Sequence, residues 1–321
     1  MMGLYPPTKP YAGLSEGEHK SLNSGKGMPK ISIRRHTKEI LNNVNALIDG
    51  FTLIPVYNYY IANIDDDIGE KGCIYARDCW NFYNNDPNSY KLEGSYVLPA
   101  LRDKIGAAFN LSAEDTKNLD YLKFYYYGDI LMAENFEGDP KRNSFNDEEW
   151  YYIRLAQKNV LSKGFDDVAK PLYESKFFRK PLAKMDTRVN EIMSGATSRD
   201  TLRYYIYSAH DTQIINALDW LQPVGHEYID ATYVSTLYFE VFYDTDCLAA
   251  TPKSQSCFNV HITHNGMPIK LQTCIDANIK RGSGSIICQY DDFLAHIDKI
   301  KVKDDINTKC NSKFTPPTSD L

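Results

Sequence analysis

The sequence lacks several features that would assign it to a class at once. No apolar run reaches the roughly 20 residues of a membrane-spanning helix, and Met1–Leu4 shows no charged segment followed by an apolar stretch, as a signal peptide would. Positive charge is not in excess: 36 Lys and Arg oppose 42 Asp and Glu, a net charge of −6, which argues against a nucleic-acid partner. Internal repeats and low-complexity tracts are absent. The 321 residues, 43% hydrophobic, suffice for one large packed domain or two small ones.

Zinc-type cysteine spacing is also missing, because no two of the seven cysteines form a Cys-x-x-Cys pair. The cysteines are Cys73, Cys79, Cys247, Cys257, Cys274, Cys288 and Cys310. A disulfide framework is the favoured interpretation, and it requires an oxidising compartment. The alternative is a cytosolic protein with inert, buried thiols.

Hydrophobic periodicity predicts a helical middle and a strand-containing remainder. From about Arg77 to Lys184 the pattern is helical, with Ser112 as an N-cap in a capping-box-like Ser-Ala-Glu-Asp sequence. Asn265-Gly266 predicts a hairpin turn. The further expected elements are a helix over Lys38–Leu47 and strands over Phe51–Tyr60, Arg203–Ser208, Val234–Tyr243 and Cys257–His264.

The most informative stretch begins with the second of these strands. The aromatic run over Arg203–Ser208 stops at small residues, a His210-Asp211 pair follows, and Gln213–Leu221 has helical spacing. This order predicts polar groups at the carboxyl end of a sheet strand, beside a helix N-terminus that favours anions such as phosphate. The plainer interpretation is a strand end capped by Asp211, with His210 merely exposed.

Several segments together resemble the histidine acid phosphatases. Tyr207-Ser208-Ala209-His210-Asp211-Thr212 is similar to the second signature of that family. Weaker similarities, in the family's order and spacing, occur at Gly3–Pro7, Gly50–Tyr57, Arg77–Cys79 and Thr236–Glu240. On these segments, which extend over nearly the whole chain, the sequence is identified as a member of the family.

The resemblance implies a fold and a domain organisation. The fold class is α/β, a phosphoglycerate-mutase-like sheet flanked by helices, with an inserted helical domain and with the first strand missing. Residues 1–60 and 184–321 would form the α/β domain, and residues 61–183 the mainly helical insertion. No cofactor and no metal are expected.

The resemblance also implies a reaction and its residues. Family members hydrolyse phosphomonoesters through a phosphohistidine. By similarity, Asp211 is the general acid that protonates the leaving alcohol, while His210 and Thr212 contact the phosphate. A carboxyl acid has to keep its proton at the working pH, which predicts a buried Asp211 and an acidic optimum.

The nucleophile motif of the family, Arg-His-Gly-x-Arg-x-Pro, does not occur in this sequence. The only Arg-His dipeptide is Arg35-His36, where Thr37 replaces the glycine, and we interpret it as part of a solvated basic patch. The chain as given is therefore expected to be inactive. Two hypotheses remain: a phosphatase whose N-terminal part, with signal peptide and first strand, is missing, or a shortened paralogue that binds a phosphorylated ligand or a protein partner. Because the resemblance starts within the block Gly3–Pro7, we expect the first.

Analogy with family positions implies the disulfides. Cys79 is expected to pair with Cys310 and Cys274 with Cys288. Cys247 and Cys257 flank a polar insertion and form a third expected pair, which leaves Cys73 over. The family and the cysteines together predict a secreted or lysosomal/vacuolar protein.

Three other polar sites have plainer interpretations. His261 and His264 fall on opposite faces of a strand, so we expect surface residues rather than metal ligands. Asp65–Asp67 is expected to be a solvated acidic cluster rather than a cation site. Tyr57 stands where the family often has a histidine, so no phosphate contact is assigned to it.

Overall fold

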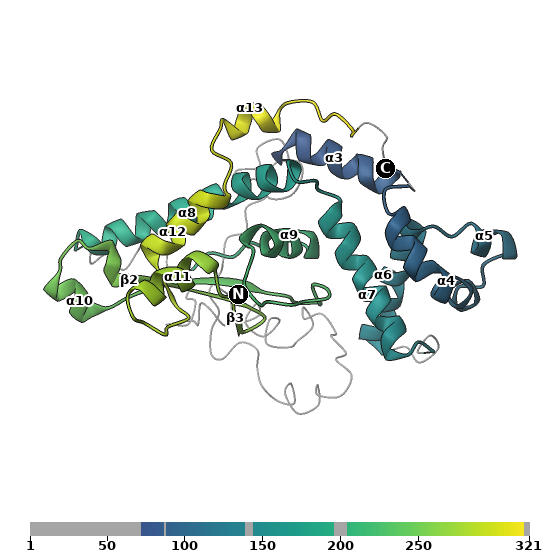
Figure 1. Ribbon diagram of the computed structural model, residues 1–321, viewed down its shortest axis with the longest axis horizontal. Coiled ribbons are helices and arrows are strands. Elements are labelled where there is room, and N and C mark those ends of the chain that lie inside the picture. Colours follow the sequence, from purple (N-terminus) through teal and green to yellow (C-terminus); the bar gives the residue numbers. More distant parts are fainter. Residues whose placement is uncertain (1–71, 87, 139–143, 196–203, 318–321) are drawn as a thin grey trace, which may run out of the picture. The chain divides into compact units, whose positions relative to one another are not determined.

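The computed structural model describes residues 72–86, 88–138, 144–195 and 204–317 (Figure 1). The chain divides into two units, Met1–Asn63 and Ile64–Leu321, and all described residues belong to the second. The predictions for Gly3–Pro7, Arg35-His36, Lys38–Leu47, Phe51–Tyr60 and Asp65–Asp67 lie outside the described residues. The domain boundaries that the resemblance implies stay predictions.

The predicted helical middle is confirmed. Its helices are α3 (Ile74–Asn85), α4 (Lys91–Ala108), α5 (Ala113–Lys117), α6 (Tyr121–Glu137), α7 (Asp147–Lys163) and α8 (Ala169–Met193). Ser112 caps α5 as predicted, because its side chain accepts a hydrogen bond from the Asp115 N–H at 3.0 Å. A reciprocal capping box, which the sequence analysis did not identify, begins α7 between Asn146 and Glu149.

The C-terminal part combines short helices with an antiparallel sheet. The helices are α9 (Asp211–Leu221), α10 (Thr245–Ala250), η4 (Gln255–Cys257), α11 (Gln272–Lys280), α12 (Tyr290–Ile300) and α13 (Ile306–Cys310). The four strands are β1 (Leu237–Tyr243), β2 (Phe258–His264), β3 (Met267–Pro268) and β4 (Cys288–Gln289). In β1 and β2 the register runs from Leu237 opposite His264 to Tyr243 opposite Phe258. The predicted strands over Val234–Tyr243 and Cys257–His264 are therefore confirmed.

The predicted hairpin turn is confirmed as well. Asn265 and Gly266 connect β2 to β3 with φ values of 51° and 79°. Two successive positive φ values are what a tight turn between twisted strands requires, and Asn-Gly is the residue pair that tolerates them best.

The predicted strand over Arg203–Ser208 is wrong for its described residues. Residues 204–210 have no regular secondary structure and pair with none of β1–β4. The aromatic and β-branched residues that suggested a strand are in part solvent-exposed: Tyr204, Tyr205 and Ile206 are 46%, 40% and 53% exposed. All strand pairs of the described residues are antiparallel. The structure is thus a mixed helix–sheet arrangement, compatible with the α/β class.

Two of the three expected disulfides are confirmed and one is corrected. Cys247 bonds to Cys257, and Cys274 bonds to Cys288. Cys310 bonds to Cys73, not to Cys79, and their Cα atoms are 4.6 Å apart. Cys73 is the N-cap of α3, so Cys79 lies roughly 9 Å further along the helix axis. The bond to Cys310 therefore forms at the N-terminus of α3 and not at Cys79. The three disulfides indicate an oxidising compartment.

Cys79 is a buried thiol whose sulfur lies 3.7 Å from the Gly164 carbonyl oxygen. Burial raises the pKa of Cys79 to about 12. The thiol therefore stays protonated and unreactive at physiological pH.

The largest hydrophobic cluster joins α8, α9 and α12 to β1 and β2. Phe178 of α8 stacks on Trp220 of α9 at 4.8 Å and meets Phe239 of β1 edge-on at 5.6 Å. This packing holds α9, whose first residue is Asp211, between a long helix and the sheet. Among the helices that the structure describes, none is long and apolar enough to cross a membrane.

Candidate functional site

The predicted site residues lie together at the start of α9. His210 is the N-cap residue, with extended backbone angles of φ −113° and ψ 168°, and Asp211 is the first helical residue. His210 and Asp211 are exposed and Thr212 is half-buried. The buried Asp211 that the sequence analysis expected is not found. The side chains that a ligand would meet are nevertheless at a helix N-terminus, where the backbone favours negative charge.

The first N–H groups of α9 already have partners. The Thr212 N–H donates to the Asp211 carboxylate at 2.8 Å, and the Gln213 N–H donates to the His210 carbonyl at 3.1 Å. The Asp211 carboxylate thus accepts a hydrogen bond from a free N–H group at the start of its own helix, as the plainer interpretation of the sequence anticipated. A phosphate bound here would have to displace the Asp211 carboxylate from the Thr212 N–H.

A buried polar network fixes the first turn of α9. Gln213 donates its side-chain amide to both carboxylate oxygens of Glu174 in α8, at 3.0 Å each. Gln213 Oε1 accepts from the Tyr173 hydroxyl at 2.6 Å. Glu174 is completely buried, and this burial raises its pKa well above the ordinary value, against the opposing effect of Lys170. Sequence analysis missed Glu174, which has no distinguishing motif within an amphipathic helix.

A second network anchors the end of α9. Asp219 accepts hydrogen bonds from Ser162 of α7, from Lys170 of α8 at 2.9 Å and from the Tyr228 hydroxyl at 2.7 Å. Although burial acts in the opposite direction, the Lys170 charge and these hydrogen bonds lower the pKa of Asp219. Both ends of α9 are therefore attached to neighbouring helices by polar contacts, which gives His210 and Asp211 a rigid base.

A second carboxyl group faces the same region. Asp129 of α6 is an exposed residue, but its carboxyl group is partly desolvated. This desolvation raises the pKa of Asp129, and the negative charge of Asp211 raises it further. Burial first, and then the charges of Asp129 and Asp211, also raise the pKa values of Tyr125 and Tyr233. Sequence analysis missed Asp129, which precedes Asp211 by 82 residues. Only the folded structure brings the two carboxyl groups within electrostatic range of each other.

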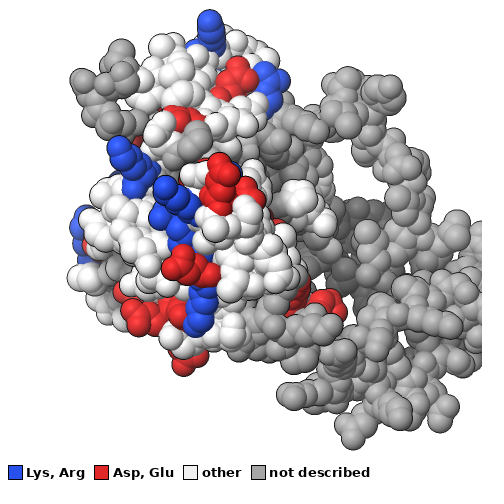
Figure 2. All heavy atoms as spheres, turned by 90° about the vertical axis from the view of Figure 1, so that its right-hand side faces the viewer, with Lys and Arg blue, Asp and Glu red and all other residues white. Residues whose placement is uncertain are grey.

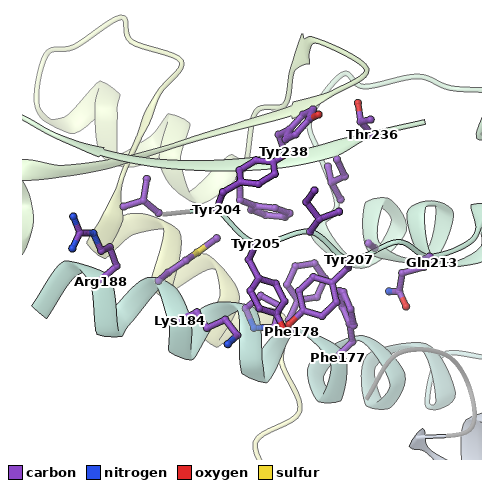
Figure 3. A pocket seen from close by; sticks show the side chains of 18 of the residues that line it. Phe177, Phe178, Lys184, Arg188, Tyr204, Tyr205, Tyr207, Gln213, Thr236 and Tyr238 are labelled. Atoms are coloured by element: carbon purple, nitrogen blue, oxygen red, sulfur yellow. The ribbon is translucent and has the colours of Figure 1, made fainter. Parts of the chain in front are cut away.

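An apolar cavity of about 630 Å³ lies beside this site (Figure 3). Its walls come from α8, the segment 204–209, the start of α9 and β1, and Gln213 lines it together with Tyr207 and Phe178. The lining is mostly aromatic and aliphatic. Figure 3 shows Lys184 and Arg188 on α8, toward the opposite end from Gln213 and Thr236. The cavity can accommodate an apolar group of a small molecule.

Charge is distributed evenly on the surface that Figure 2 shows. Basic and acidic side chains of the described residues alternate there, and most of the surface between them is uncharged. This distribution provides no broad field that would attract a polyanion.

The two histidines of β2 have different environments. His261 lies 3.1 Å from the Glu240 carboxylate and is partly exposed. His264 is buried, so its prediction as a surface residue is wrong. The reason is that β2 is covered on the His264 face by the loop after α9, which contributes His226. Within the part of the chain that the structure describes, no group of three or more His, Cys, Asp or Glu side chains is arranged to hold a metal ion.

Comparisons with known proteins give no assignment. No model of a known protein family matches the chain, and no curated protein matches it in a sequence search.

Proposed function

We propose that the start of α9 is the proton-donating half of a phosphomonoester hydrolase site of the histidine acid phosphatase type. The observation that supports this best is the position of His210 and Asp211, adjacent and exposed at a helix N-terminus that polar networks anchor at both ends. An imidazole and a carboxyl group at such a position suit a phosphate ester and its leaving alcohol.

In this proposal the residues have separate roles. His210 contacts the phosphate oxygens, and the Thr212 N–H, released from Asp211, donates to one of them. Asp211 protonates the leaving oxygen, which requires a carboxyl group that holds its proton at acidic pH. Desolvation, followed by the negative charge of Asp211, raises the pKa of Asp129, which favours a protonated carboxyl group beside Asp211 at acidic pH.

The finer assignments follow from the same proposal. The fold would be phosphoglycerate-mutase-like, with the helical residues 61–183 inserted into an α/β domain formed by 1–60 and 184–321. The substrate would be a phosphomonoester, and catalysis would use no cofactor. The oxidising compartment would be the lysosome or vacuole, or the extracellular space.

The experiment that tests this proposal supplies the nucleophile. A segment containing Arg-His-Gly-x-Arg-x-Pro, fused before residue 1, should give turnover of p-nitrophenyl phosphate at acidic pH, whereas the 321-residue chain alone should give none above background. In the fused protein, Asp211→Asn should reduce turnover by about 10²–10⁴-fold, the usual contribution of a general acid. Asp147→Asn is the matched control, because Asp147 is likewise the first residue of an exposed helix start, that of α7.

A second candidate function is ligand binding without hydrolysis. The 630 Å³ apolar cavity beside α9 favours it, since a ligand with an apolar body and a phosphate group could occupy both features. This function would be supported over the first if a phosphorylated ligand binds to the protein and His210→Ala abolishes the binding. The fused protein would then bind the ligand without hydrolysing it.

A further inference from the structure

A linear group of three hydrogen-bonded side chains lies at the start of β1. Ser235 Oγ is 2.9 Å from His264 Nε2, and His264 Nδ1 is 2.9 Å from His226 Nε2. His226 and Ser235 come from the loop that connects α9 to β1, and His264 is the last residue of β2. A serine hydroxyl on one nitrogen of a histidine, with a third group on the other nitrogen, is the arrangement that activates a serine as a nucleophile.

We propose that Ser235, His264 and His226 form a catalytic group that hydrolyses carboxylic esters with an apolar acyl or aryl part. This activity is separate from the phosphate site at α9. It uses none of the residues assigned there, and its substrate class is different.

Ser235 Oγ has two acceptors in reach, His264 Nε2 at 2.9 Å and Asn265 Oδ1 at 3.2 Å. Asn265 Oδ1 also accepts the Thr236 N–H at 2.8 Å. In the reactive arrangement the Ser235 hydroxyl donates to the nearer acceptor, His264 Nε2, while His264 carries its own proton on Nδ1 and donates it to His226 Nε2. This is the tautomer in which a histidine removes a serine proton.

The surroundings keep both imidazoles neutral. Burial, followed by the proximity of His226, lowers the pKa of His264. Burial, followed by the positive charge of Lys158 from α7, lowers the pKa of His226. The Tyr228 ring lies 5.9 Å from each imidazole, and Lys158 Nζ lies 4.1 Å from the centre of that ring. Neutral His264 is the form that acts as a general base.

The hairpin holds the group in place. Leu237 of β1 pairs with His264 of β2, and the Asn265 N–H donates to the Thr236 carbonyl at 2.9 Å. The Thr236 N–H fixes the orientation of the Asn265 amide, which leaves Asn265 Nδ2 as a donor to the oxygen that becomes negative during attack.

Backbone strain directly precedes the serine. Val234 has φ 61° and is 88% exposed. A β-branched residue is a genuine outlier in this left-handed region. Because the Val234 side chain is exposed, its packing does not offset the strain. Strained backbone of this kind concentrates at functional sites, where it aims a neighbouring side chain.

The apolar cavity gives the substrate class. Ser235 and Thr236 line it, and Figure 3 shows Thr236 at the end remote from Arg188, with Tyr204 and Tyr238 nearby. An ester bound with its carbonyl carbon at Ser235 would extend an apolar group along these aromatic side chains. A volume of about 630 Å³ is that of a small-molecule site.

The reaction balances without a cofactor. Ser235 Oγ attacks the ester carbonyl carbon while its proton passes to His264 Nε2. The tetrahedral intermediate collapses, the C–O bond to the alcohol breaks, and His264 returns the proton to the departing oxygen. Water then attacks the acyl-serine by the same route, which releases the acid and restores the hydroxyl.

The test uses the full chain with p-nitrophenyl butyrate at pH 8, and a fluorophosphonate probe followed by peptide mass spectrometry. We expect turnover, probe attached to Ser235, and a loss of at least about 100-fold in Ser235→Ala. Ser283→Ala, at an exposed serine in the loop after α11, should leave turnover unchanged.

Two substitutions of His226 separate a catalytic from a structural role. His226→Gln keeps an acceptor for His264 Nδ1–H and should retain most of the turnover, whereas His226→Leu should lose it at an unchanged melting temperature. No turnover by the unmodified chain, labelling at a serine other than Ser235, or turnover that survives Ser235→Ala would overturn the proposal.

Discussion

Gln213, in the first turn of α9, donates its amide to both carboxylate oxygens of the fully buried Glu174 in α8. This contact joins the helix that presents His210 and Asp211 to the longest helix of the described residues. It also places an ionisable group in the core, so the stability of the site region should depend on pH.

The pH dependence has a definite sign. The pKa of Glu174 is raised in the folded protein, so the folded state holds a proton that the unfolded state releases as pH rises above about 4.5. The stabilising contribution is therefore complete below that pH and is lost as pH rises through the folded pKa. The Glu174→Gln variant has no ionisable group at this position. Its melting temperature should therefore exceed that of the unmodified protein, and the difference should grow as the pH rises toward 8.

Thermal unfolding of both proteins between pH 4 and pH 8 measures this difference. Glu227→Gln, at an exposed position, is the control and should follow the unmodified protein throughout. A Glu174→Gln variant with a pH-independent offset would show that Glu174 is not protonated in the fold.

The carboxyl pair predicts a coupled titration. Because the charge of Asp211 contributes to the raised pKa of Asp129, Asp211→Asn should lower the pKa of Asp129 toward its ordinary value. Carbon-13 NMR titration of the aspartate carboxyl groups measures this directly. Asp147→Asn, at the start of α7, should leave the pKa of Asp129 unchanged. If Asp211→Asn also leaves that pKa unchanged, the two carboxyl groups are not coupled.

The disulfide assignment predicts which cysteine is free. Peptide mapping without reduction should recover Cys73 linked to Cys310 and Cys79 as a thiol. Cys73→Ser should lower the free energy of unfolding in urea by about 2–5 kcal/mol, because this bond closes the longest loop in the chain. Cys79→Ala should cost less, and recovery of Cys79 linked to Cys310 would restore the assignment by family analogy.

The strained valine predicts a stabilising substitution. The left-handed conformation of Val234 costs a β-branched residue about 1–3 kcal/mol, whereas glycine adopts it without strain. Val234→Gly should therefore raise the melting temperature, even though glycine is more flexible when unfolded. Val224→Gly is the control, because Val224 is exposed without a positive φ, and this change should destabilise. Equal effects of the two substitutions would show that Val234 is not strained.

Local patterns predicted the elements that depend on local forces. Hydrophobic periodicity predicted the helical region that contains α3 to α8. Ser112 and Asn265-Gly266 were identified because capping and turn residues act within a few positions. The strand over Arg203–Ser208 was wrong because aromatic and β-branched residues indicate a strand only when a neighbouring strand pairs with it.

Contacts between distant segments could not be predicted. Asp129 and Glu174 lie on helices with ordinary amphipathic patterns, and only packing brings them near α9. Cys73 and Cys79 are both buried beside Cys310, so their choice of partner depends on helix geometry rather than on spacing. His264 looked like a surface residue because its covering loop comes 38 positions earlier.

The central claim is that His210 and Asp211 form half of a phosphohydrolase site, and the most direct measurement is turnover of p-nitrophenyl phosphate by the chain fused to an Arg-His-Gly-x-Arg-x-Pro segment. The account predicts turnover at acidic pH that falls at least about 100-fold in Asp211→Asn and is unchanged in Asp147→Asn. A folded fusion protein without turnover, or with turnover that Asp211→Asn leaves intact, would contradict it.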